Sequence, residues 1–265
     1  MIIGGLQKFS LLDYPNHISA IIFTKGCNFR CHFCYNPMLV LPAKGRKKKD
    51  HFLILEDGLF DFLKKRKGKL EAVVITGGEP TLHKDLPEFL GKIKKLSYKI
   101  KLDTNGTNPA MLSALINSPL LKGGRGVKAV GKVDEHNPPR PPLQGGSVGL
   151  INYIAMDIKG SPEKYENIVG AKVSLSKIRK SIKLIIDSGL PYEFRTTVVP
   201  GLIEKKDIAK MGKLIKGAKI WYLQQFKSDT DLVDKKFKKV RPYKDEELEE
   251  MRKIGEKYAG ECRVR

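Results

Sequence analysis

Short apolar runs rich in β-branched residues alternate with amphipathic stripes along most of this 265-residue chain. The stripes place apolar side chains at helical spacing, whereas the short runs have the length and composition of buried strands. Six runs predict strands, over residues 18–24, 72–76, 100–104, 153–158, 194–199 and 220–223. The helical stripes cover residues 86–93, 111–116, 175–185, 208–215 and 248–258. This alternation predicts an α/β fold with a parallel sheet, as in a closed or partial (β/α) barrel, whose functional residues lie at the C-terminal ends of the strands.

Residues 123–149 interrupt the alternation. They contain seven Gly and four Pro in 27 residues, a share typical of irregular chain. We therefore expect one domain over residues 1–265, with 123–149 as a Gly/Pro-rich inserted surface loop. Its Lys and Arg residues could bind a partner, although a passive insertion is the simpler interpretation.

The composition excludes several classes of protein. Hydrophobic residues make up 41% and charged residues 30% of the chain, which is typical of a globular protein rather than a disordered or collagen-like one. No apolar run reaches the roughly 18–20 residues of a membrane span, and the N-terminal residues do not have the pattern of a signal peptide. We therefore expect a cytoplasmic protein without membrane association.

The chain is strongly basic, with 50 Lys and Arg against 29 Asp and Glu and a formal net charge of +21. Such an excess suits binding to nucleic acid or to an acidic protein, or simply keeps the chain in solution. The lysines are widely spread, with short clusters at residues 47–49 and 235–239, and no known nucleic-acid-binding motif accompanies them. A direct nucleic-acid function is therefore disfavoured.

Three of the four cysteines form a compact motif directly after the first predicted strand. Cys27, Cys31 and Cys34 have CxxxCxxC spacing, whereas Cys262 lies far away in the sequence. In a cytoplasmic chain, clustered thiols indicate a metal or cluster site rather than disulfides. Three thiolates can hold three irons of a 4Fe–4S cube and leave the fourth iron open to a ligand. Two alternatives stay open: His32 completes a Cys3His zinc site, or Cys262 is a fourth cluster ligand rather than a free thiol.

The cysteine spacing, with Phe33 just before the last cysteine, resembles that of the radical S-adenosylmethionine (SAM) enzymes, and the resemblance extends over nearly the whole chain apart from 123–149. It implies a partial (β/α)6 barrel that is open on one side, and a contact between Phe33 and SAM. It also implies that the open iron binds the amino and carboxylate groups of SAM. One-electron reduction then yields methionine and a 5′-deoxyadenosyl radical, which removes a hydrogen atom from the substrate. No catalytic side chain is expected, because the radical forms on the cofactor.

Polar motifs follow the second and third predicted strands. The TGGEP motif at 76–80 contains glycines, which allow a backbone to approach a ligand closely. It resembles the family's site for the methionine amino group, which implies SAM contacts for Gly77, Gly78 and Glu79. The DTNG motif at 103–106 places Asp103 and Asn105 at a strand end, where a carboxylate and an amide suit the ribose or amino acid part of SAM. Tight turns are the alternative explanation for both motifs.

Charged residues also accompany the fourth and fifth predicted strands. Asp157 and Lys159 lie on the same face because side chains alternate along a strand. They either grip the zwitterionic part of SAM or pair with each other. Arg195 has a planar guanidinium that suits the SAM carboxylate, with an ion pair as the alternative. In pyruvate formate-lyase activators a carboxylate pair is associated with a monovalent cation, and the resemblance implies such a cation at Asp103 and Asp157.

The stretch at 4–15, GGLQKFSLLDYP, narrows the resemblance. Together with DTNG, AMDIK and RTTVVPG it is similar to activating proteins of anaerobic ribonucleoside-triphosphate reductase and to pyruvate formate-lyase activating enzyme. This implies that the chain installs a glycyl radical on a partner enzyme, with that reductase as the first candidate. The basic charge suits an acidic electron donor such as a flavodoxin or a ferredoxin-type protein. The alternatives are a radical SAM enzyme for a small molecule, such as a 7-carboxy-7-deazaguanine synthase, and a non-enzymatic Fe–S or zinc module that binds nucleic acid.

Overall fold

The computed structural model describes residues 1–41, 53–118 and 149–265, and in these residues eight strands form one open sheet. The strand order follows the sequence, β1 pairs with β2 in antiparallel orientation, and every later neighbour is parallel. The strands are β1 (Ile3–Ser10), β2 (Ser19–Thr24), β3 (Ala72–Gly77), β4 (Lys99–Thr104), β5 (Tyr153–Asp157), β6 (Tyr192–Val198), β7 (Ala218–Gln225) and β8 (Ala259–Val264). The predicted α/β class and partial barrel are therefore confirmed.

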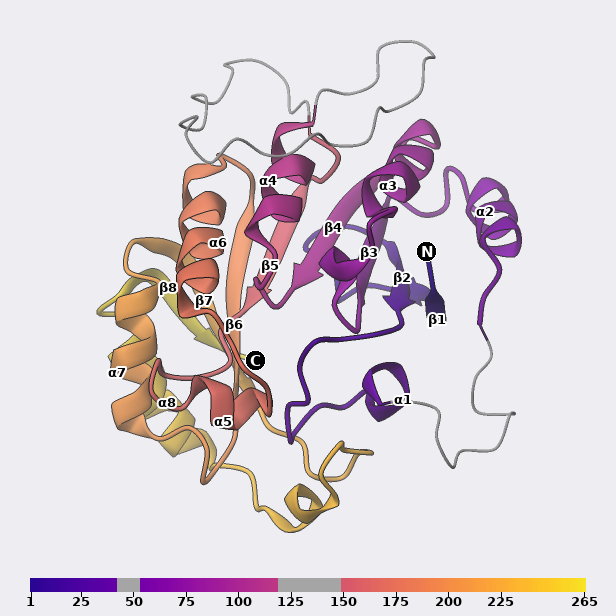
Figure 1. Cartoon of the computed structure of the whole chain (residues 1–265). Coiled ribbons are helices and arrows are strands. Elements are labelled where there is room, and N and C mark those ends of the chain that lie inside the picture. Colours follow the sequence, from indigo (N-terminus) through magenta and orange to yellow (C-terminus); the bar gives the residue numbers. More distant parts are fainter. Residues whose placement is uncertain (42–52, 119–148) are drawn as a thin grey trace.

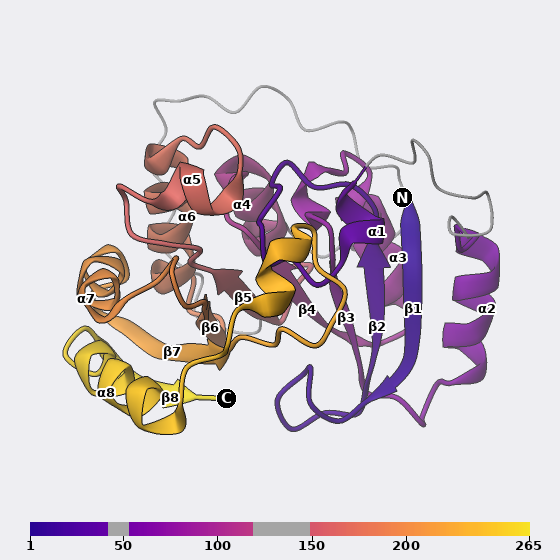
Figure 2. The ribbon, with the colours of Figure 1, turned by 90° about the horizontal axis from the view of Figure 1, so that it is seen from below.

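The sheet is curved, with helices along its outer side (Figure 1). Figure 2 shows the strands as an arc that runs from β1 at one edge to β8 at the other. The helices are α1 (Pro37–Val40), α2 (Glu56–Lys65), α3 (Leu86–Lys95), α4 (Pro109–Asn117), α5 (Tyr165–Val169), α6 (Leu175–Asp187), α7 (Lys205–Leu214) and α8 (Asp245–Gly255), with the short 3-10 helices η2 (Pro80–Leu82) and η3 (Lys235–Lys239). The five predicted helical stripes coincide with α3, α4, α6, α7 and α8, and the six predicted strands coincide with β2 to β7.

The two edge strands escape the sequence patterns because both are poor in apolar residues. β1 reads IGGLQKFS. Its pairing with β2 shifts register between Ile3 and Gly5 and again between Gln7 and Ser10. β8 buries only Ala259 and Cys262. Each edge strand pairs on one side with a long buried neighbour, so tertiary context rather than intrinsic preference determines the conformation.

A small apolar cluster lies apart from the main core of the molecule. Tyr14, Ile21, Ala72 and Val74 form this buried cluster, whereas the main core lies under the helices. A space lined largely by polar residues lies at the C-terminal ends of the strands. The parallel orientation of β2 to β7 brings the ends of all six strands to that space.

The predicted inserted loop at 123–149 lies outside the described residues, except for Gly149. In the parts of the chain that the structure describes, no helix has both the length and the apolar character needed to cross a membrane.

A buried threonine on β6 allows a test of the packing between the sheet and its helices. Thr196 Oγ1 donates to the Ile158 carbonyl at 2.9 Å and accepts from Trp221 Nε1 at 3.0 Å. We expect Thr196→Val to lower the free energy of unfolding by about 2 kcal/mol or more, because it leaves a buried indole N–H and a buried carbonyl without partners. Denaturant unfolding of the metal-free protein measures this change.

The matched control is Thr197→Val, at the next position of the same strand but on the cavity side. We expect it to change the free energy of unfolding by no more than about 0.5 kcal/mol. Equal losses in the two variants would contradict the role assigned to the hydrogen bonds of Thr196.

Candidate active site

A cavity of about 530 Å³ opens at the C-terminal ends of the parallel strands. It is lined by every residue that the sequence motifs single out as a ligand of a cluster or of SAM. These residues are Cys27, Phe33, Cys31, Cys34, Gly77, Gly78, Glu79, Asp103, Asn105, Asp157, Lys159 and Arg195. The structure thus brings together, from β2 to β6, residues that are far apart in the sequence.

The cysteine loop, residues 27–34, follows β2 and is held from two sides. Arg30 N donates to the Val169 carbonyl of α5 at 2.7 Å. On the other side, Val233 N donates to the Cys34 carbonyl at 3.2 Å and Asp234 N donates to the His32 carbonyl at 3.0 Å. The backbone of the loop is therefore fixed by segments that come much later in the chain.

The three thiols of this loop are free, with Cys31 buried and Cys27 and Cys34 partly buried. Burial raises the pKa of Cys27 to about 11 and that of Cys31 to about 12. Thiolates are the ligands of Fe–S clusters, and cluster binding would replace the protons that burial keeps on these sulfurs. Three unpaired soft donors beside one polar cavity fit a 4Fe–4S cluster with three protein ligands.

The two alternative ligands of the sequence analysis point elsewhere. His32 Nε2 lies 3.1 Å from the Asn167 carbonyl, and its ring stacks on Phe237 with an interplanar angle of 10°. Cys262 is buried in the core beside Gly255 and Trp221 and does not line the cavity. Among the residues that the structure describes, no three His, Cys, Asp or Glu side chains converge on a single metal ion.

The glycines of the TGGEP motif are required by the protein's own backbone rather than by space for a ligand. A Cβ at Gly78 would lie 1.9 Å from the Gly26 carbonyl oxygen, and a Cβ at Gly77 would lie 2.5 Å from Thr24 N. Gly77 also has a φ of +109°, which disfavours any other residue. The end of β3 therefore packs directly on the backbone that leads into Cys27.

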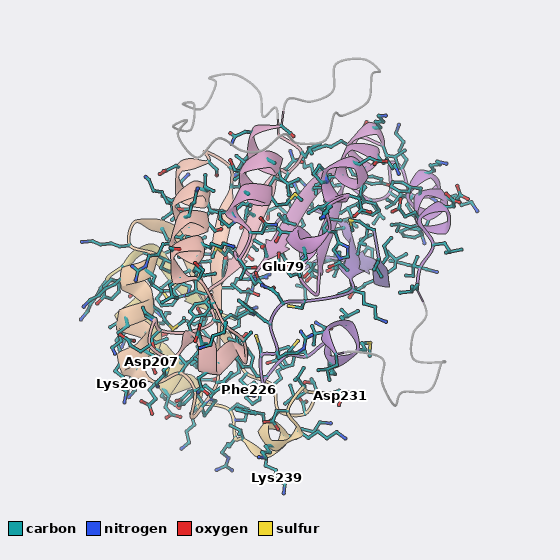
Figure 3. All side chains as sticks on the ribbon, in the orientation of Figure 1. Glu79, Lys206, Asp207, Phe226, Asp231 and Lys239 are labelled. Atoms are coloured by element: carbon teal, nitrogen blue, oxygen red, sulfur yellow. The ribbon has the colours of Figure 1, made fainter. Side chains whose placement is uncertain are left out.

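Glu79 is a buried carboxylate that connects two of the motifs, and Figure 3 shows it deep in the centre of the molecule. Its Oε1 accepts from Thr104 Oγ1 at 2.7 Å, from Thr81 Oγ1 at 2.5 Å and from Thr81 N at 3.1 Å. Its Oε2 accepts from Asn105 N at 2.6 Å. Burial raises the pKa of Glu79, against the effect of these donors. Oε2 keeps a lone pair for one further donor at the cavity wall.

The DTNG motif forms the turn that the sequence allowed as an alternative, and it also lines the cavity. Gly106 has a φ of +76°, and Asn105 Oδ1 accepts from Thr107 N at 3.0 Å. Asn105 Nδ2 donates to Asn28 Oδ1 at 2.9 Å, which connects this turn to the cysteine loop. The amide of Asn105 thus positions the loop that carries the thiols.

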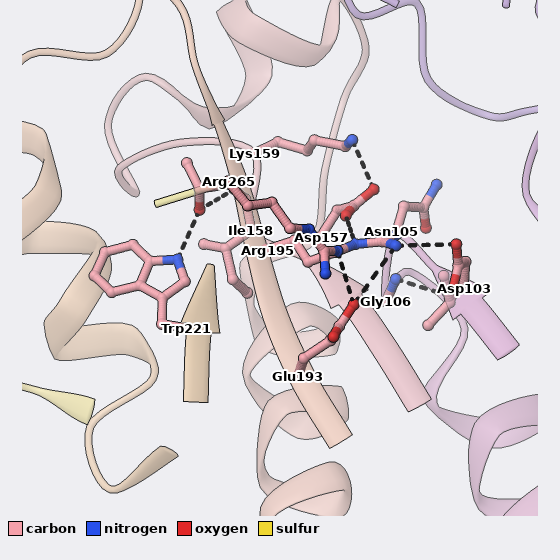
Figure 4. A network of polar contacts seen from close by, with 12 residues as sticks. Asp103, Asn105, Gly106, Asp157, Ile158, Lys159, Glu193, Arg195, Trp221 and Arg265 are labelled. Carbon is pink, nitrogen blue, oxygen red and sulfur yellow. Dashed lines mark hydrogen bonds and ion pairs between the residues drawn. The ribbon is translucent and has the colours of Figure 1, made fainter. Parts of the chain in front are cut away.

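Arg195 bridges two carboxylates on the cavity floor (Figure 4). Its Nη1 donates to Asp103 Oδ2 at 3.0 Å and its Nε donates to Asp157 Oδ1 at 2.9 Å. Lys159 Nζ donates to Asp157 Oδ2 at 2.9 Å, so Asp157 is held between two cations. Although burial opposes it, the charges of Arg195 and Lys159 lower the pKa of Asp157 well below its usual range. These are the ion pairs that the sequence analysis gave as alternatives to ligand contacts.

A second group of charges lies beneath this floor. Lys101 Nζ is 3.3 Å from Glu193 Oε1, both side chains are almost fully buried, and Arg265 Nη2 is 3.1 Å from the same oxygen. The charges of Lys101, Arg195 and Arg265 lower the pKa of Glu193 against the effect of its burial. Within the described residues, Asp103 Oδ1 is buried without a hydrogen-bond partner, and Lys101 Nζ is 3.8 Å away. Asp103 Oδ1 therefore lies beside the buried Lys101 ammonium.

The sequence analysis predicts a monovalent cation at Asp103 and Asp157, and both carboxylates lie on this floor. The guanidinium of Arg195 binds both Asp103 and Asp157 and already supplies positive charge between them. A cation at these carboxylates therefore stays a prediction.

Several cavity residues are absent from the sequence predictions. Thr197, Gln224, Gln225 and Lys227 line the side formed by β6 and β7. Asp13, Phe29, Tyr35, Asn36, Val40 and Arg265 also line the cavity. The two glutamines follow the sixth predicted strand directly, so the rule that functional residues lie at strand ends would have found them. Arg265 and Asp13 have no such signal, because the outer strands place them.

Comparisons with known proteins agree with this geometry. The profile of the Radical SAM superfamily matches residues 21–123. A provisionally named glycyl-radical enzyme activating enzyme of Methanocaldococcus jannaschii is 31% identical over 269 residues, which cover 100% of this chain and 95% of that protein. A 7-carboxy-7-deazaguanine synthase of Aquifex aeolicus is 40% identical over 89 residues, or 34% of this chain and 36% of that enzyme. A crystal structure of a spore photoproduct lyase mutant matches with a TM-score of 0.56 and 13% identity over 97% of this chain and 78% of that chain, a likeness of fold.

The close contact between Gly78 and Gly26 predicts that a single methyl group will disturb the cysteine loop. We expect Gly78→Ala to displace the backbone before Cys27, and hence to lower the iron bound after anaerobic reconstitution several-fold. Helical content should stay unchanged in circular dichroism. The control is Gly91→Ala in α3, where a Cβ would meet no atom within 4 Å; iron loss in this control would contradict the explanation.

The position of Arg195 between two carboxylates predicts a stability effect that depends on pH. We expect Arg195→Met to lower the free energy of unfolding by about 3–5 kcal/mol near neutral pH, because it removes a hydrogen-bonded cation from Asp103 and leaves Asp157 with Lys159 alone. Arg195→Lys should lower the free energy of unfolding by a smaller amount. Lysine keeps the positive charge, although it lacks the planar guanidinium that donates to both carboxylates. Denaturant unfolding of the metal-free protein measures both variants.

The sign of the pH effect follows from the lowered pKa of Asp157. The ionised carboxylate stabilises the folded chain above the ordinary aspartate pKa of 3.8, and this contribution is lost as the pH falls through the lower folded value. The difference between the wild type and Arg195→Met should therefore shrink on acidification below about pH 4. A difference that grows on acidification would contradict the assignment.

Proposed function

The chain belongs to the radical SAM superfamily and is a radical SAM enzyme resembling the glycyl-radical enzyme activating enzymes, and from this premise we propose that it installs a glycyl radical on a partner enzyme. The first candidate partner is anaerobic ribonucleoside-triphosphate reductase, and a pyruvate formate-lyase type of enzyme is the second. The observation that carries the proposal is the meeting of three unpaired thiols and three strand-end motifs around one cavity.

In this proposal Cys27, Cys31 and Cys34 hold a 4Fe–4S cluster, and their number leaves one iron for SAM. The reduced cluster and SAM together supply a 5′-deoxyadenosyl radical, which takes a hydrogen atom from a glycine Cα of the partner. The burial of the thiols keeps water away from the cluster and limits side reactions of the radical.

The side chains around the cavity bind and orient SAM. Glu79 Oε2 has a free lone pair for the methionine ammonium, and Phe33 offers an apolar surface beside the thiols. Lys159 and Arg195 present cations towards the methionine carboxylate while Asp157 fixes both of them. Because the charged groups are already paired, they need little rearrangement when the ligand enters.

The full-length relative favours a protein substrate over a small molecule. The similarity to the 7-carboxy-7-deazaguanine synthase covers only about a third of the chain, whereas the similarity to the activating enzyme covers all of it. The sheet is also open between β1 and β8, which suits access by a segment of a large partner. An electron donor of the flavodoxin or ferredoxin type completes the proposed set of partners.

Anaerobic incubation with a candidate partner, SAM and dithionite tests the proposal. We expect a glycyl-radical doublet in electron paramagnetic resonance with the true partner and no doublet with the others. Cys31→Ala should abolish both the doublet and the brown colour of the reconstituted protein, because only two thiols remain.

Cys262→Ser is the matched control, because it alters a buried thiol that does not line the cavity. It should retain the cluster and the doublet. A wild-type protein that binds zinc and stays colourless, or that cleaves SAM but yields no doublet with any glycyl-radical partner, would contradict the proposal.

A further inference from the structure

The connection between β7 and α8, residues 226–244, packs against the cysteine loop from outside the cavity. The backbone bonds from Val233 and Asp234 reach Cys34 and His32, and the Phe237 ring stacks on the His32 ring. Of this connection, only Lys227 is within the cavity lining. Figure 1 shows it at the same end of the molecule as α1 and α5. This segment, which contains η3, is therefore the outer cover of the thiols.

The same connection is strongly basic. It contains seven Lys or Arg and three Asp, and η3 itself reads KKFKK. Its lysines are exposed, and Figure 3 shows Lys239 extending away from the body of the molecule. Phe237, the one apolar residue of η3, turns inward to His32. The lysines thus form a charged surface directly over the loop that carries the thiols.

Little of this charge is neutralised within the chain. Asp231 Oδ1 lies 3.4 Å from Lys238 Nζ, and Asp234 Oδ2 lies 3.9 Å from His32 Nδ1. Among the residues that the structure describes, the ammonium groups of Lys235, Lys236 and Lys239 have no carboxylate within 4.0 Å. These three side chains are available to a partner, and we call them the η3 lysines.

The proposed function requires one electron from outside the chain for each radical formed. We propose that the η3 lysines are the docking surface for an acidic one-electron donor protein, an inference that rests on the proposed function. The donor is oxidised by one electron and the cluster held by the three thiols is reduced by one, without a proton transfer at this surface. Opposite charges would steer the donor to the side of the cysteine loop away from the cavity, which leaves the cavity open to SAM and the partner enzyme.

Charge reversal tests this inference. The test variant is Lys235→Glu/Lys236→Glu/Lys239→Glu. The matched control is Lys177→Glu/Lys180→Glu/Lys213→Glu, which changes the net charge equally at exposed positions of α6 and α7. The probe is a flavodoxin, used oxidised for binding to the metal-free chain by calorimetry and fully reduced for SAM cleavage by the reconstituted chain.

We expect the test variant to bind flavodoxin about tenfold or more weakly at low ionic strength, with the difference shrinking as salt is added. Its flavodoxin-driven SAM cleavage should fall to a similar extent, whereas cleavage with dithionite stays within about twofold of the wild type. The Lys→Arg triple variant should bind as the wild type does. Unchanged binding in the test variant, an equal loss in the control, or η3 lysines that bind RNA and not flavodoxin would overturn the inference.

Dithionite separates this inference from the proposed function. If the wild type forms the glycyl radical with dithionite and the test variant loses SAM cleavage only with flavodoxin, both the proposed function and the docking inference stand. If the wild type produces no glycyl radical with either reductant, the proposed function fails, while the binding measurement still decides whether the η3 lysines receive the acidic protein.

Discussion

The backbone contact between Gly26 and Gly78 determines where the thiols stand. Gly78 N donates to the Thr24 carbonyl and Glu79 N donates to the Gly26 carbonyl, each at 2.8 Å. Cys27 follows directly, and the Glu79 side chain continues the connection to Thr104 and Asn105 at the end of β4. One close approach thus couples the ends of three neighbouring strands, so the first cysteine and the cavity wall cannot shift independently.

The charges of the cavity floor meet two opposing requirements. A zwitterionic ligand needs both signs nearby, but isolated buried charges are costly. Arg195 meets both requirements by binding Asp103 and Asp157 at once. Beneath the floor, Lys101 pairs with the buried Glu193. The amino acid part of such a ligand, with one ammonium and one carboxylate, adds no net charge, so it can lie beside these pairs without unbalancing them.

Sequence patterns predicted β2 to β7 and the residues at their ends because each of these strands contains a short run rich in apolar or β-branched residues, and parallel pairing makes neighbouring ends meet. They did not predict β1 and β8, whose conformation depends on pairing with a neighbour. At Gly78 the structure adds a reason for glycine that the pattern did not contain, because the Gly26 carbonyl lies where a Cβ would be, and the SAM contact of Gly78 stays a prediction. Which charges pair depends on the fold and not on local sequence, since Arg195 on β6 and Asp103 on β4 are 92 residues apart and lie on either side of β5.

The connection after β7 is unusually long, and its additional length allows it to reach the cysteine loop. A strand and its following helix usually need about 2–6 connecting residues, yet residues 226–244 separate β7 from α8. The additional chain reaches across to Cys34 and His32 and supplies backbone donors that the cysteine loop cannot find within itself. A loop with thiols for a cluster must face the cavity, so its outer side needs a cover. Placing lysines on that cover puts positive charge close to the thiols without placing it in the cavity, where it would compete with Lys159 and Arg195 for the ligand carboxylate.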